Sequence, residues 1–322
     1  MVTPAAVGSL VSWGAHESER HDREPFVTRH ALDESTLFTD DALAALMDRY
    51  PRERLQVFTM GTDPLDNTQW APVDTAGVSG ADMLRAAASG RLWIKLMRID
   101  LVDEAYRGLL ERAYEQIWSA CPDIKRSYIR PLILISSPRA LVYYHADAYP
   151  TMLWHIRGSK RMWVYPAADS RFIDPKLMEQ IYAGEIDEEV PFDISFDQHA
   201  RYFDLRPGDL ITWPLNAPHR IVNHDSVNVS VSVQYATDRG EQRALLFQAN
   251  RFLRSRLGLQ VSSIRDDGPG ATFKRAAYRI ARKLNLAATK GRKREYVAHY
   301  RVDGGAADGM SLVPGGPVRT PF

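Results

Sequence analysis

The spacing of apolar residues along the chain changes near residue 130. Before that point, apolar positions mostly repeat at helical intervals, which predicts helices over 39–50, 79–88 and 103–120. Thr39 and the acidic residues after it supply an N-cap and a first turn for the first of these helices. Only 91–99 alternates residue by residue, which predicts a strand.

From Arg130 the pattern becomes one of short β-rich runs separated by turns. These runs are 132–135, 141–144, 152–156, 162–165, 202–205, 210–213 and 227–235. Gly158-Ser159 and Pro207-Gly208-Asp209 are strong turn signals between them. The pattern predicts a mainly β fold with flanking helices, built as a sandwich or barrel. Residues 167–200 interrupt it and are expected to be an insertion with one short helix and an acidic loop.

Helical spacing returns after Thr237. One stripe consists of Leu245, Ala249, Phe252, Leu253 and Leu257. It fits a homodimer interface and equally fits packing on the barrel. A second helix is expected with Phe273, Ala277, Ile280 and Leu284 on one face and Lys274, Arg275, Arg279, Arg282 and Lys283 on the other.

These patterns divide the chain into four parts. We expect a flexible N-terminus over 1–24 and a catalytic domain over 25–237. A basic helical region over 238–301 would follow, and the Gly- and Pro-rich residues 302–322 are expected to be disordered.

Charge is distributed unevenly along the chain. Residues 251–301 hold 14 Lys or Arg against 3 Asp or Glu, whereas the rest holds 27 against 37. This polarity fits an anionic partner at the basic C-terminal helix, such as a membrane surface, nucleic acid or an acidic substrate. It fits equally a solvated helical face that lies against the acidic body. The sequence shows no transmembrane run or secretory signal and one cysteine, Cys121, so a reducing, cytoplasmic location is expected.

The motif His145-Ala146-Asp147 is the first candidate for chemistry. On a strand, residues two apart project to one face, so both side chains can reach one metal ion. Two histidines and one carboxylate with open positions is the arrangement of non-haem iron oxygenases. His219 follows a predicted strand and the rigid Pro218, so we expect it to be the third ligand. His224 lies in a predicted turn and is expected to be solvated, whereas His155 either packs within the barrel or faces the pocket.

Lys160 is the second candidate. It follows a turn after the strand that comes next to the metal motif. A long-stemmed barrel lysine can reach inward and hold a carboxylate by charge-assisted hydrogen bonds. The alternative is a surface lysine at a hairpin.

Together these residues resemble the JmjC-like cupin family of iron(II)- and 2-oxoglutarate-dependent oxygenases, and within it the factor-inhibiting asparaginyl hydroxylase. The resemblance covers about 91–235. One block is His145-x-Asp147 with Lys160 fifteen positions after the His, and the other is Gly208-Asp209 with His219 eleven positions after the Gly. The resemblance implies a double-stranded β-helix (a cupin or jelly-roll barrel) and a hydroxylase or demethylase that uses Fe(II), 2-oxoglutarate and O2.

The resemblance also assigns roles to single residues. It implies that His145, Asp147 and His219 bind iron and that Lys160 pairs with the distal carboxylate of 2-oxoglutarate. Further residues implied at the cosubstrate are Gln234, Thr151 and Trp93, with Lys95 looking toward the substrate. Val142 departs from the family pattern, because it replaces a threonine that helps to hold the cosubstrate.

Three functional hypotheses follow. The first is the 2-oxoglutarate-dependent oxygenase, whose substrate could be a protein side chain, a sugar, a lipid precursor or a small metabolite. The second is a metal-binding cupin with other chemistry, such as an isomerase or a cosubstrate-free dioxygenase. The third is a non-catalytic cupin that binds a ligand. Lys160 argues against the second, and the complete set of three ligands argues against the third.

Overall fold

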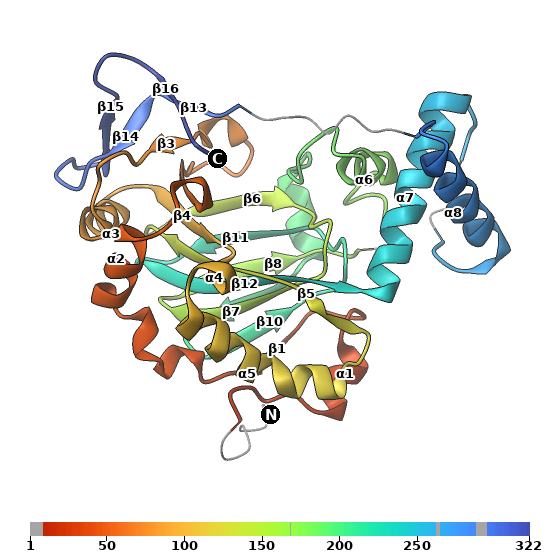
Figure 1. Ribbon diagram of the computed structural model, residues 1–322, viewed down its shortest axis with the longest axis horizontal. Coiled ribbons are helices and arrows are strands. Elements are labelled where there is room, and N and C mark those ends of the chain that lie inside the picture. Colours follow the sequence, from red (N-terminus) through yellow and green to blue (C-terminus); the bar gives the residue numbers. More distant parts are fainter. Residues whose placement is uncertain (1–8, 168, 262–264, 288–294) are drawn as a thin grey trace.

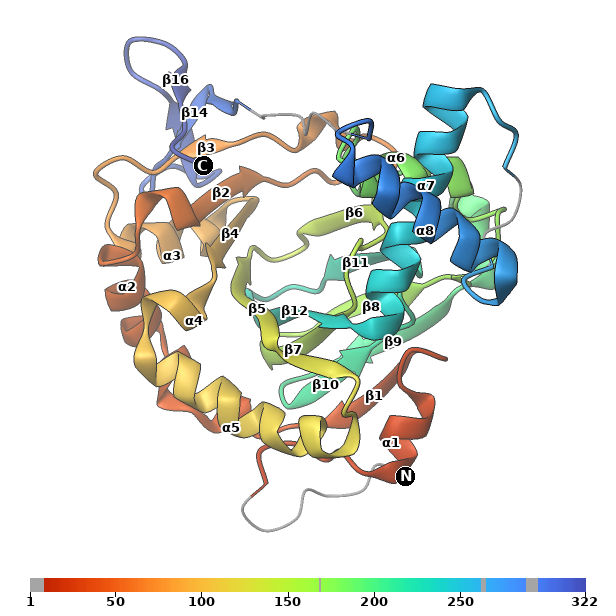
Figure 2. The ribbon, with the colours of Figure 1, turned by 45° about the vertical axis from the view of Figure 1, so that its right-hand side comes forward.

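Two antiparallel sheets face each other and enclose the barrel interior (Figures 1 and 2). The structure is a computed structural model that describes residues 9–167, 169–261, 265–287 and 295–322. The large sheet has the order β1 (Phe26–Arg29), β10 (Asp209–Thr212), β7 (Thr151–Arg157), β12 (Asn228–Thr237), β5 (Ile124–Ser136), β4 (Leu92–Met97), β2 (Leu55–Thr59). The small sheet has the order β6 (Leu141–His145), β11 (His219–Asn223), β8 (Lys160–Val164), β9 (Arg201–Leu205). This is the double-stranded β-helix that the sequence predicts.

The alternation of β12 shows how one strand serves two faces. Val229, Val231 and Val233 belong to the main core, which the helices cover. Ser232 and Gln234 point the other way and line a cavity in the barrel interior. The sequence therefore places small polar groups inside the barrel at every second position of this strand.

Helices cover the outer face of the large sheet (Figures 1 and 2). They are α1 (Ala15–Arg20), α2 (Asp40–Asp48), α3 (Gly80–Ser89), α4 (Ile99–Val102) and α5 (Glu104–Ala120). Short 3-10 turns are η1 (Leu32–Glu34), η2 (Thr36–Phe38), η3 (Arg52–Arg54), η4 (Asn67–Gln69) and η5 (Ile194–His199). Thr39 caps α2 through its hydroxyl, which accepts a hydrogen bond from the Ala42 amide, as the sequence predicts. The expected helices and the strand between them are confirmed within one or two residues.

The expected insertion lies against β6, the strand that ends at His145. It contains α6 (Pro175–Tyr182) and η5, and it packs its aromatic residues around Tyr144 and Tyr165. Glu189 forms an isolated β-bridge with His145. The acidic loop therefore extends the edge of the small sheet.

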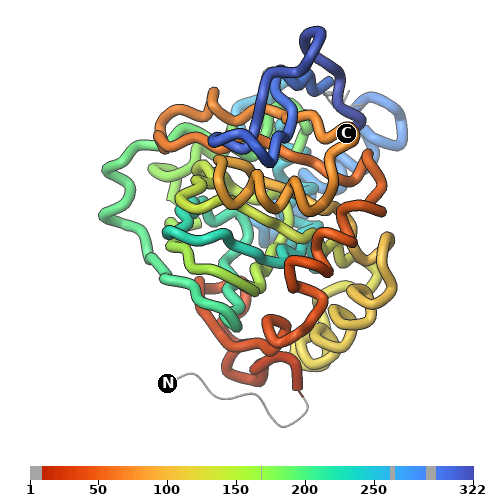
Figure 3. The backbone as a smooth tube through the Cα atoms, turned by 90° about the vertical axis from the view of Figure 1, so that its left-hand side faces the viewer, coloured from red at the N-terminus to blue at the C-terminus, as the bar shows by residue number. Residues whose placement is uncertain are grey.

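The C-terminal region departs from the expectation. After α7 (Asp238–Leu257) and α8 (Gly268–Lys283), the chain returns to the barrel and forms short strands instead of a disordered tail over 302–322 (Figure 3). β13 (Val297–Ala298) pairs with β16 (Val318–Arg319), while β14 (Tyr300–Val302) pairs with β15 (Met310–Leu312) and with β3 (Val73–Asp74). The glycines of this segment form tight turns, such as the one at Gly309 with φ 71°. Ala298 and Val302 are buried and hold the segment against the rest of the protein, which the Gly- and Pro-rich composition does not predict.

The N-terminus also differs from the expected flexible segment over 1–24. Residues 1–8 lie outside the described residues, but Val11 and Trp13 are buried and α1 follows them. Burial of these apolar side chains fixes the segment against the core. Within the described ranges, no helix combines the length and apolarity needed to cross a membrane.

Candidate metal centre

Three side chains predicted as metal ligands meet at one end of the barrel. His145 ends β6, His219 begins β11, and the two are direct cross-strand partners. Asp147 follows two residues after His145, just beyond the end of its strand. One potential ligand atom from each residue lies within 4.8 Å of the others. The distances from the carboxylate oxygens of Asp147 are 4.0 Å to His145 Nε2 and 3.7 Å to His219 Nε2.

Backbone carbonyls orient both imidazole rings. Nδ1 of His145 lies 2.7 Å from the Tyr143 carbonyl oxygen, and Nδ1 of His219 lies 3.1 Å from that of Ala217. Because a carbonyl only accepts, each Nδ1 donates and each Nε2 is left as the lone-pair nitrogen. Both Nε2 atoms face Asp147. The lone pairs of the two rings are therefore directed to the place where one metal ion could also meet the carboxylate.

The electrostatics of the cluster fit a bound cation. Asp147 is buried, and its Oδ2 has no hydrogen-bond partner among the described residues. Burial raises the pKa of the Asp147 carboxyl, against the opposing effect of His145. Burial and then His145 lower the pKa of His219 well below its ordinary value. Two imidazoles and a buried carboxyl group with one unpartnered oxygen form a donor set that suits Fe(II), with positions left open.

The cluster opens into a cavity of about 470 Å³. One wall is aromatic and contains Phe58, Trp70, Trp93 and Tyr296. The lining also includes Asp187, Glu188 and Glu189 from the insertion. Trp213 packs against His219 with ring centroids 4.6 Å apart. The metal ligands therefore face a space that could hold small molecules and not a filled core.

A family model for a cupin-like domain matches residues 17–240. The chain belongs to the cupin-like domain family. Among curated proteins, none matches this cupin-like chain.

Solved structures share the cupin-like fold. The Escherichia coli protein ycfD is 16% identical over 84% of this chain and 67% of its own, with a TM-score of 0.51. Another structure, of the E. coli ribosomal oxygenase YcfD, is 14% identical over 84% of this chain and 66% of its own, with a TM-score of 0.48. A third structure, of YcfD with cobalt and 2-oxoglutarate, is 15% identical over 81% of this chain and 63% of its own, with a TM-score of 0.46. All three are structures of YcfD, of which this chain spans about two thirds, and the likeness to the first of them at 16% identity shows the fold alone.

Three of the residues that the resemblance places at the cosubstrate line the cavity. Thr151 and Gln234 are neighbours across β7 and β12, and Trp93 is on β4. Val142 also lines it and offers no hydroxyl. Lys95, from the same face as Trp93, holds its ammonium 4.0 Å from the Trp93 ring centroid. The structure therefore brings these side chains to the same space as the three metal ligands.

Lys160 is placed differently. It is buried on the inner face of β8, but it is not among the residues that line the cavity. Its Nζ donates to Ser230 Oγ over 3.0 Å, and burial lowers the pKa of Lys160 to about 7. Ser230 is two residues from the cavity residue Ser232 on the same face of β12, so Lys160 lies deeper in the barrel than the cavity.

The other histidines near the motif have structural partners. His155 is buried in β7, with Nδ1 3.0 Å from Ser230 Oγ and Nε2 3.0 Å from the Gly158 carbonyl oxygen. Of its two expected positions, it takes the one packed within the barrel. His224 is exposed in a turn, as expected, with Nδ1 3.2 Å from Ser159 Oγ.

Sequence reasoning missed Ser232 and Glu188. Ser232 could have been found from the alternation of valine with polar residues in β12. Glu188 had no such signal, because only the folded insertion brings it to the metal motif, where Oε1 accepts from the Ala148 amide over 2.9 Å. Burial, and then the charge of Asp147, raise the pKa of Glu188 to about 7.

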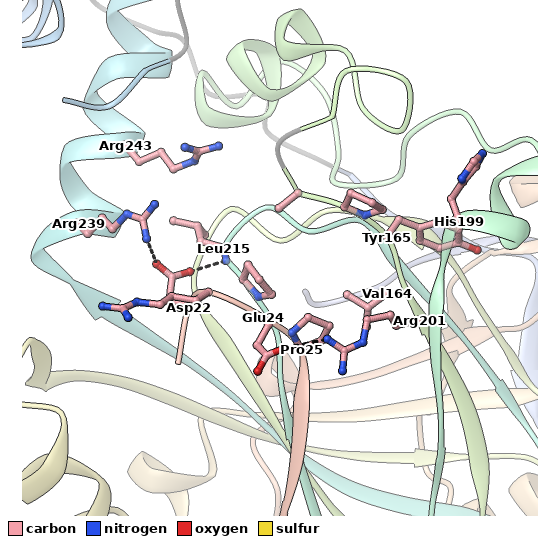
Figure 4. Close-up of a pocket in the computed structure, with 14 residues that line it drawn as sticks. Asp22, Glu24, Pro25, Val164, Tyr165, His199, Arg201, Leu215, Arg239 and Arg243 are labelled. Atoms are coloured by element: carbon pink, nitrogen blue, oxygen red, sulfur yellow. Dashed lines mark hydrogen bonds and ion pairs between the residues drawn. The ribbon is translucent and has the colours of Figure 1, made fainter. Parts of the chain in front are cut away.

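A second cavity of about 630 Å³ lies beside α7 and contains none of the three candidate ligands (Figure 4). Four of its charged side chains form two ion pairs across it. Asp22 pairs with Arg239, and Glu24 pairs with Arg201. Arg243 of α7 lies at its edge.

Proposed function

We propose that this cupin-like protein is an Fe(II)- and 2-oxoglutarate-dependent oxygenase that hydroxylates or demethylates its substrate. The observation that carries the proposal is the convergence of His145, Asp147 and His219 at the end of an accessible cavity. Three protein ligands leave positions open on the metal for a keto acid and for oxygen.

Each part of the cavity has a role in this proposal. His145, Asp147 and His219 would hold the iron, with the Nδ1–carbonyl bonds fixing both rings. Thr151, Ser232 and Gln234 offer hydrogen bonds to 2-oxoglutarate beside it. Bound iron and 2-oxoglutarate would supply the oxidising chemistry, with succinate and CO2 as products. The aromatic wall and Trp213 would exclude water from the reacting atoms.

The distal carboxylate of 2-oxoglutarate has two candidate partners. The family resemblance assigns it to Lys160, and for that the cavity would have to extend from Ser232 to Ser230. Lys95 is the lysine that lines the cavity in this structure. Substituting each lysine in turn by methionine distinguishes the two candidates. Loss of the lysine that binds the distal carboxylate should weaken 2-oxoglutarate binding and leave metal affinity unchanged.

The position of Lys160 also favours a second candidate function. A cupin that binds metal but performs isomerisation or cosubstrate-free dioxygenation needs no dicarboxylate anchor in its cavity, and Lys160 does not line it. This alternative predicts metal binding without 2-oxoglutarate binding.

The deciding experiment is oxygen-dependent succinate release by the purified protein with Fe(II) and 2-oxoglutarate. We expect slow turnover without substrate and none after His219→Ala, with metal affinity reduced more than about 100-fold in that variant. His224→Ala is the matched control, because His224 is an exposed turn residue. Metal binding without 2-oxoglutarate binding would favour the alternative.

The substrate and partners are open within this proposal. A protein side chain, a sugar, a lipid precursor and a small metabolite all remain candidates. We also propose a cytoplasmic location. We further propose a homodimer through the C-terminal helices, supported by exposed Phe273 and Ile280 on α8 and Leu284 directly after it. An anionic partner would contact Lys274, Arg279, Arg282 and Lys283, but not Arg275, which is buried and donates to the Asp266 carbonyl oxygen.

A further inference from the structure

Asn216 is a buried residue with an unusual backbone in the loop that leads to His219. Its exposed fraction is 2% and its φ is 64°, in the left-handed region where asparagine is the most tolerated residue after glycine. The next residue, Ala217, offers the carbonyl that orients the His219 ring. The conformation at Asn216 therefore sets the course of the chain into a metal ligand.

The side chain of Asn216 joins three separate segments. Its Nδ2 donates to the backbone carbonyl of Asp147 and to the Tyr182 hydroxyl, both over 2.9 Å. Its Oδ1 accepts from Nε of Arg243 over 2.7 Å. A guanidinium only donates and a carbonyl only accepts, so these partners allow one orientation of the amide.

These contacts matter because they fix the backbone that carries the Asp147 carboxylate, whose side-chain hydrogen-bonding neighbours are Thr151 and Trp213. Its Oδ2 has no hydrogen-bond partner among the described residues. The backbone is instead held from two sides, by Asn216 at the Asp147 carbonyl and by Glu188 at the Ala148 amide. Asn216 thus ties the segment that carries the carboxylate to the loop that carries His219.

Arg243 brings the C-terminal helix into this arrangement. It projects from α7 at the edge of the second cavity (Figure 4), outside the residues 17–240 that match the family model. Nη1 of Arg243 lies 3.5 Å from Asp266, and its guanidinium lies 5.3 Å from the Phe247 ring centroid. The helix therefore presents a fixed charge that orients the Asn216 amide.

We propose that Asn216 is a positioning residue for the metal centre, oriented by Arg243 from α7. The inference rests on the proposed metal site. Asn216 does not contact the ion; it holds Asp147 and His219 at the separation that one ion requires. Outer partners of this kind change metal affinity by about 10- to 100-fold when they are removed.

Cobalt(II) titration of the full chain, followed by visible absorbance, tests the proposal. Asn216→Gly retains easy access to the left-handed backbone but loses all three side-chain hydrogen bonds. Asn216→Ala loses the three hydrogen bonds and also the easy access to this backbone conformation. We expect both to weaken Co(II) binding about 10- to 100-fold and to alter the Co(II) absorption bands. Asn285→Ala is the control, because Asn285 is an exposed left-handed asparagine (φ 56°) at the end of α8.

The outcomes separate this inference from the proposed function. Thermal unfolding of the metal-free variants measures any purely structural effect, and both variants should unfold at a lower temperature than the wild type, because each loses three buried hydrogen bonds. Wild-type Co(II) affinity in both Asn216 variants would overturn the inference. A wild type that binds no Co(II) would instead overturn the proposed function. If both variants fail to fold, Arg243→Ala decides: a loss of roughly three-fold or more supports the inference, and unchanged affinity overturns it.

Discussion

Lys160 has an ammonium group deep inside the barrel with a single neutral hydrogen-bond partner, Ser230. Burial lowers the pKa of Lys160 to about 7, far below that of a lysine in an unfolded chain. Between pH 7 and about 10, the unfolded chain therefore binds more protons at this position than the folded one does. The free energy of unfolding should rise with pH in this window, by at most ~1.4 kcal/mol per pH unit from this group.

A comparison with Lys160→Met measures that contribution. Methionine fills a similar volume without a charge, so the variant lacks this pH dependence. The difference in unfolding free energy, variant minus wild type, should be largest at pH 7 and shrink toward pH 10, as measured by urea denaturation of the metal-free protein. A difference that stays constant with pH would show that the lysine keeps its ordinary pKa.

At the scale of elements, the β7–β8 hairpin depends on Gly158. Its φ is 85°, and a Cβ there would lie 2.5 Å from the carbonyl oxygen of Val227. Gly77 also has a positive φ, of 69°, but a Cβ there would meet nothing within 4 Å. A substitution at Gly77 therefore introduces backbone strain alone, whereas a substitution at Gly158 introduces the same strain and a steric clash.

We expect Gly77→Ala to cost about 1 kcal/mol and Gly158→Ala clearly more, about 2–3 kcal/mol. The added cost arises because the backbone at Val227, just before β12, must move to admit the methyl group. Thermal denaturation of both variants checks this. Equal costs for the two would mean that the Val227 carbonyl yields without penalty.

The same hairpin shows what the sequence could predict. The spacing from His145 to Lys160 and from Gly208 to His219 predicted three converging ligands and a lysine facing the barrel interior. It could not predict the depth of Lys160, because depth depends on the register of β8 against β9 and β11. Alternation along one strand gives a face, whereas register is a property of two strands.

Other elements were missed for reasons of length and context. β1 and β2 have four and five residues and lie in the part of the chain whose apolar spacing mostly predicts helices, so they are recognisable only through pairing with β10 and β4. The sequence pattern places His219 after the strand 210–213 and predicts no strand at β11, whose first residue is His219. Asn216 gave no signal, because its role comes from partners that lie far away in the sequence.

At the scale of the whole molecule, α8 covers part of the apolar stripe on α7. Leu245, Ala249 and Phe252 pack against α8 residues such as Tyr278 and Ala281. This part of the stripe is therefore covered within one chain, whereas Leu257 at the end of α7 is 57% exposed. Most of the apolar surface left for a second copy is on α8. There Phe273 is 75% exposed and Ile280 is 58% exposed.

The proposed homodimer should therefore depend on α8. Replacing both Phe273 and Ile280 by glutamate should convert a dimer to a monomer, because burying two carboxylates in an apolar interface is costly. Light scattering after size-exclusion chromatography measures the mass. Arg279→Glu, at an exposed position of the same helix, is the control. A wild type that is monomeric at high concentration would remove this proposal.

The C-terminal segment 295–322 connects the far end of the chain to the cavity. Tyr296 lines the cavity, and its ring centroid is 5.8 Å from that of Phe58, which stacks on Trp70 at 4.3 Å. Phe322 contacts both Phe58 and Tyr296. A segment that follows the family match by more than fifty residues thus completes the aromatic wall.

Removing the Tyr296 ring should uncover this wall without disturbing the metal ligands. We expect Tyr296→Ala to cost about 0.5–1.5 kcal/mol in unfolding free energy, from lost aromatic contacts, and to increase acrylamide quenching of tryptophan fluorescence as Trp70 becomes accessible. Co(II) affinity should stay at the wild-type value, because Tyr296 is not one of the groups that orient the ligands. Tyr300→Ala, on β14 and outside the cavity lining, should leave quenching unchanged. If both variants quench like the wild type, Tyr296 does not shield the aromatic wall, and the cavity is shaped by the barrel and the insertion alone.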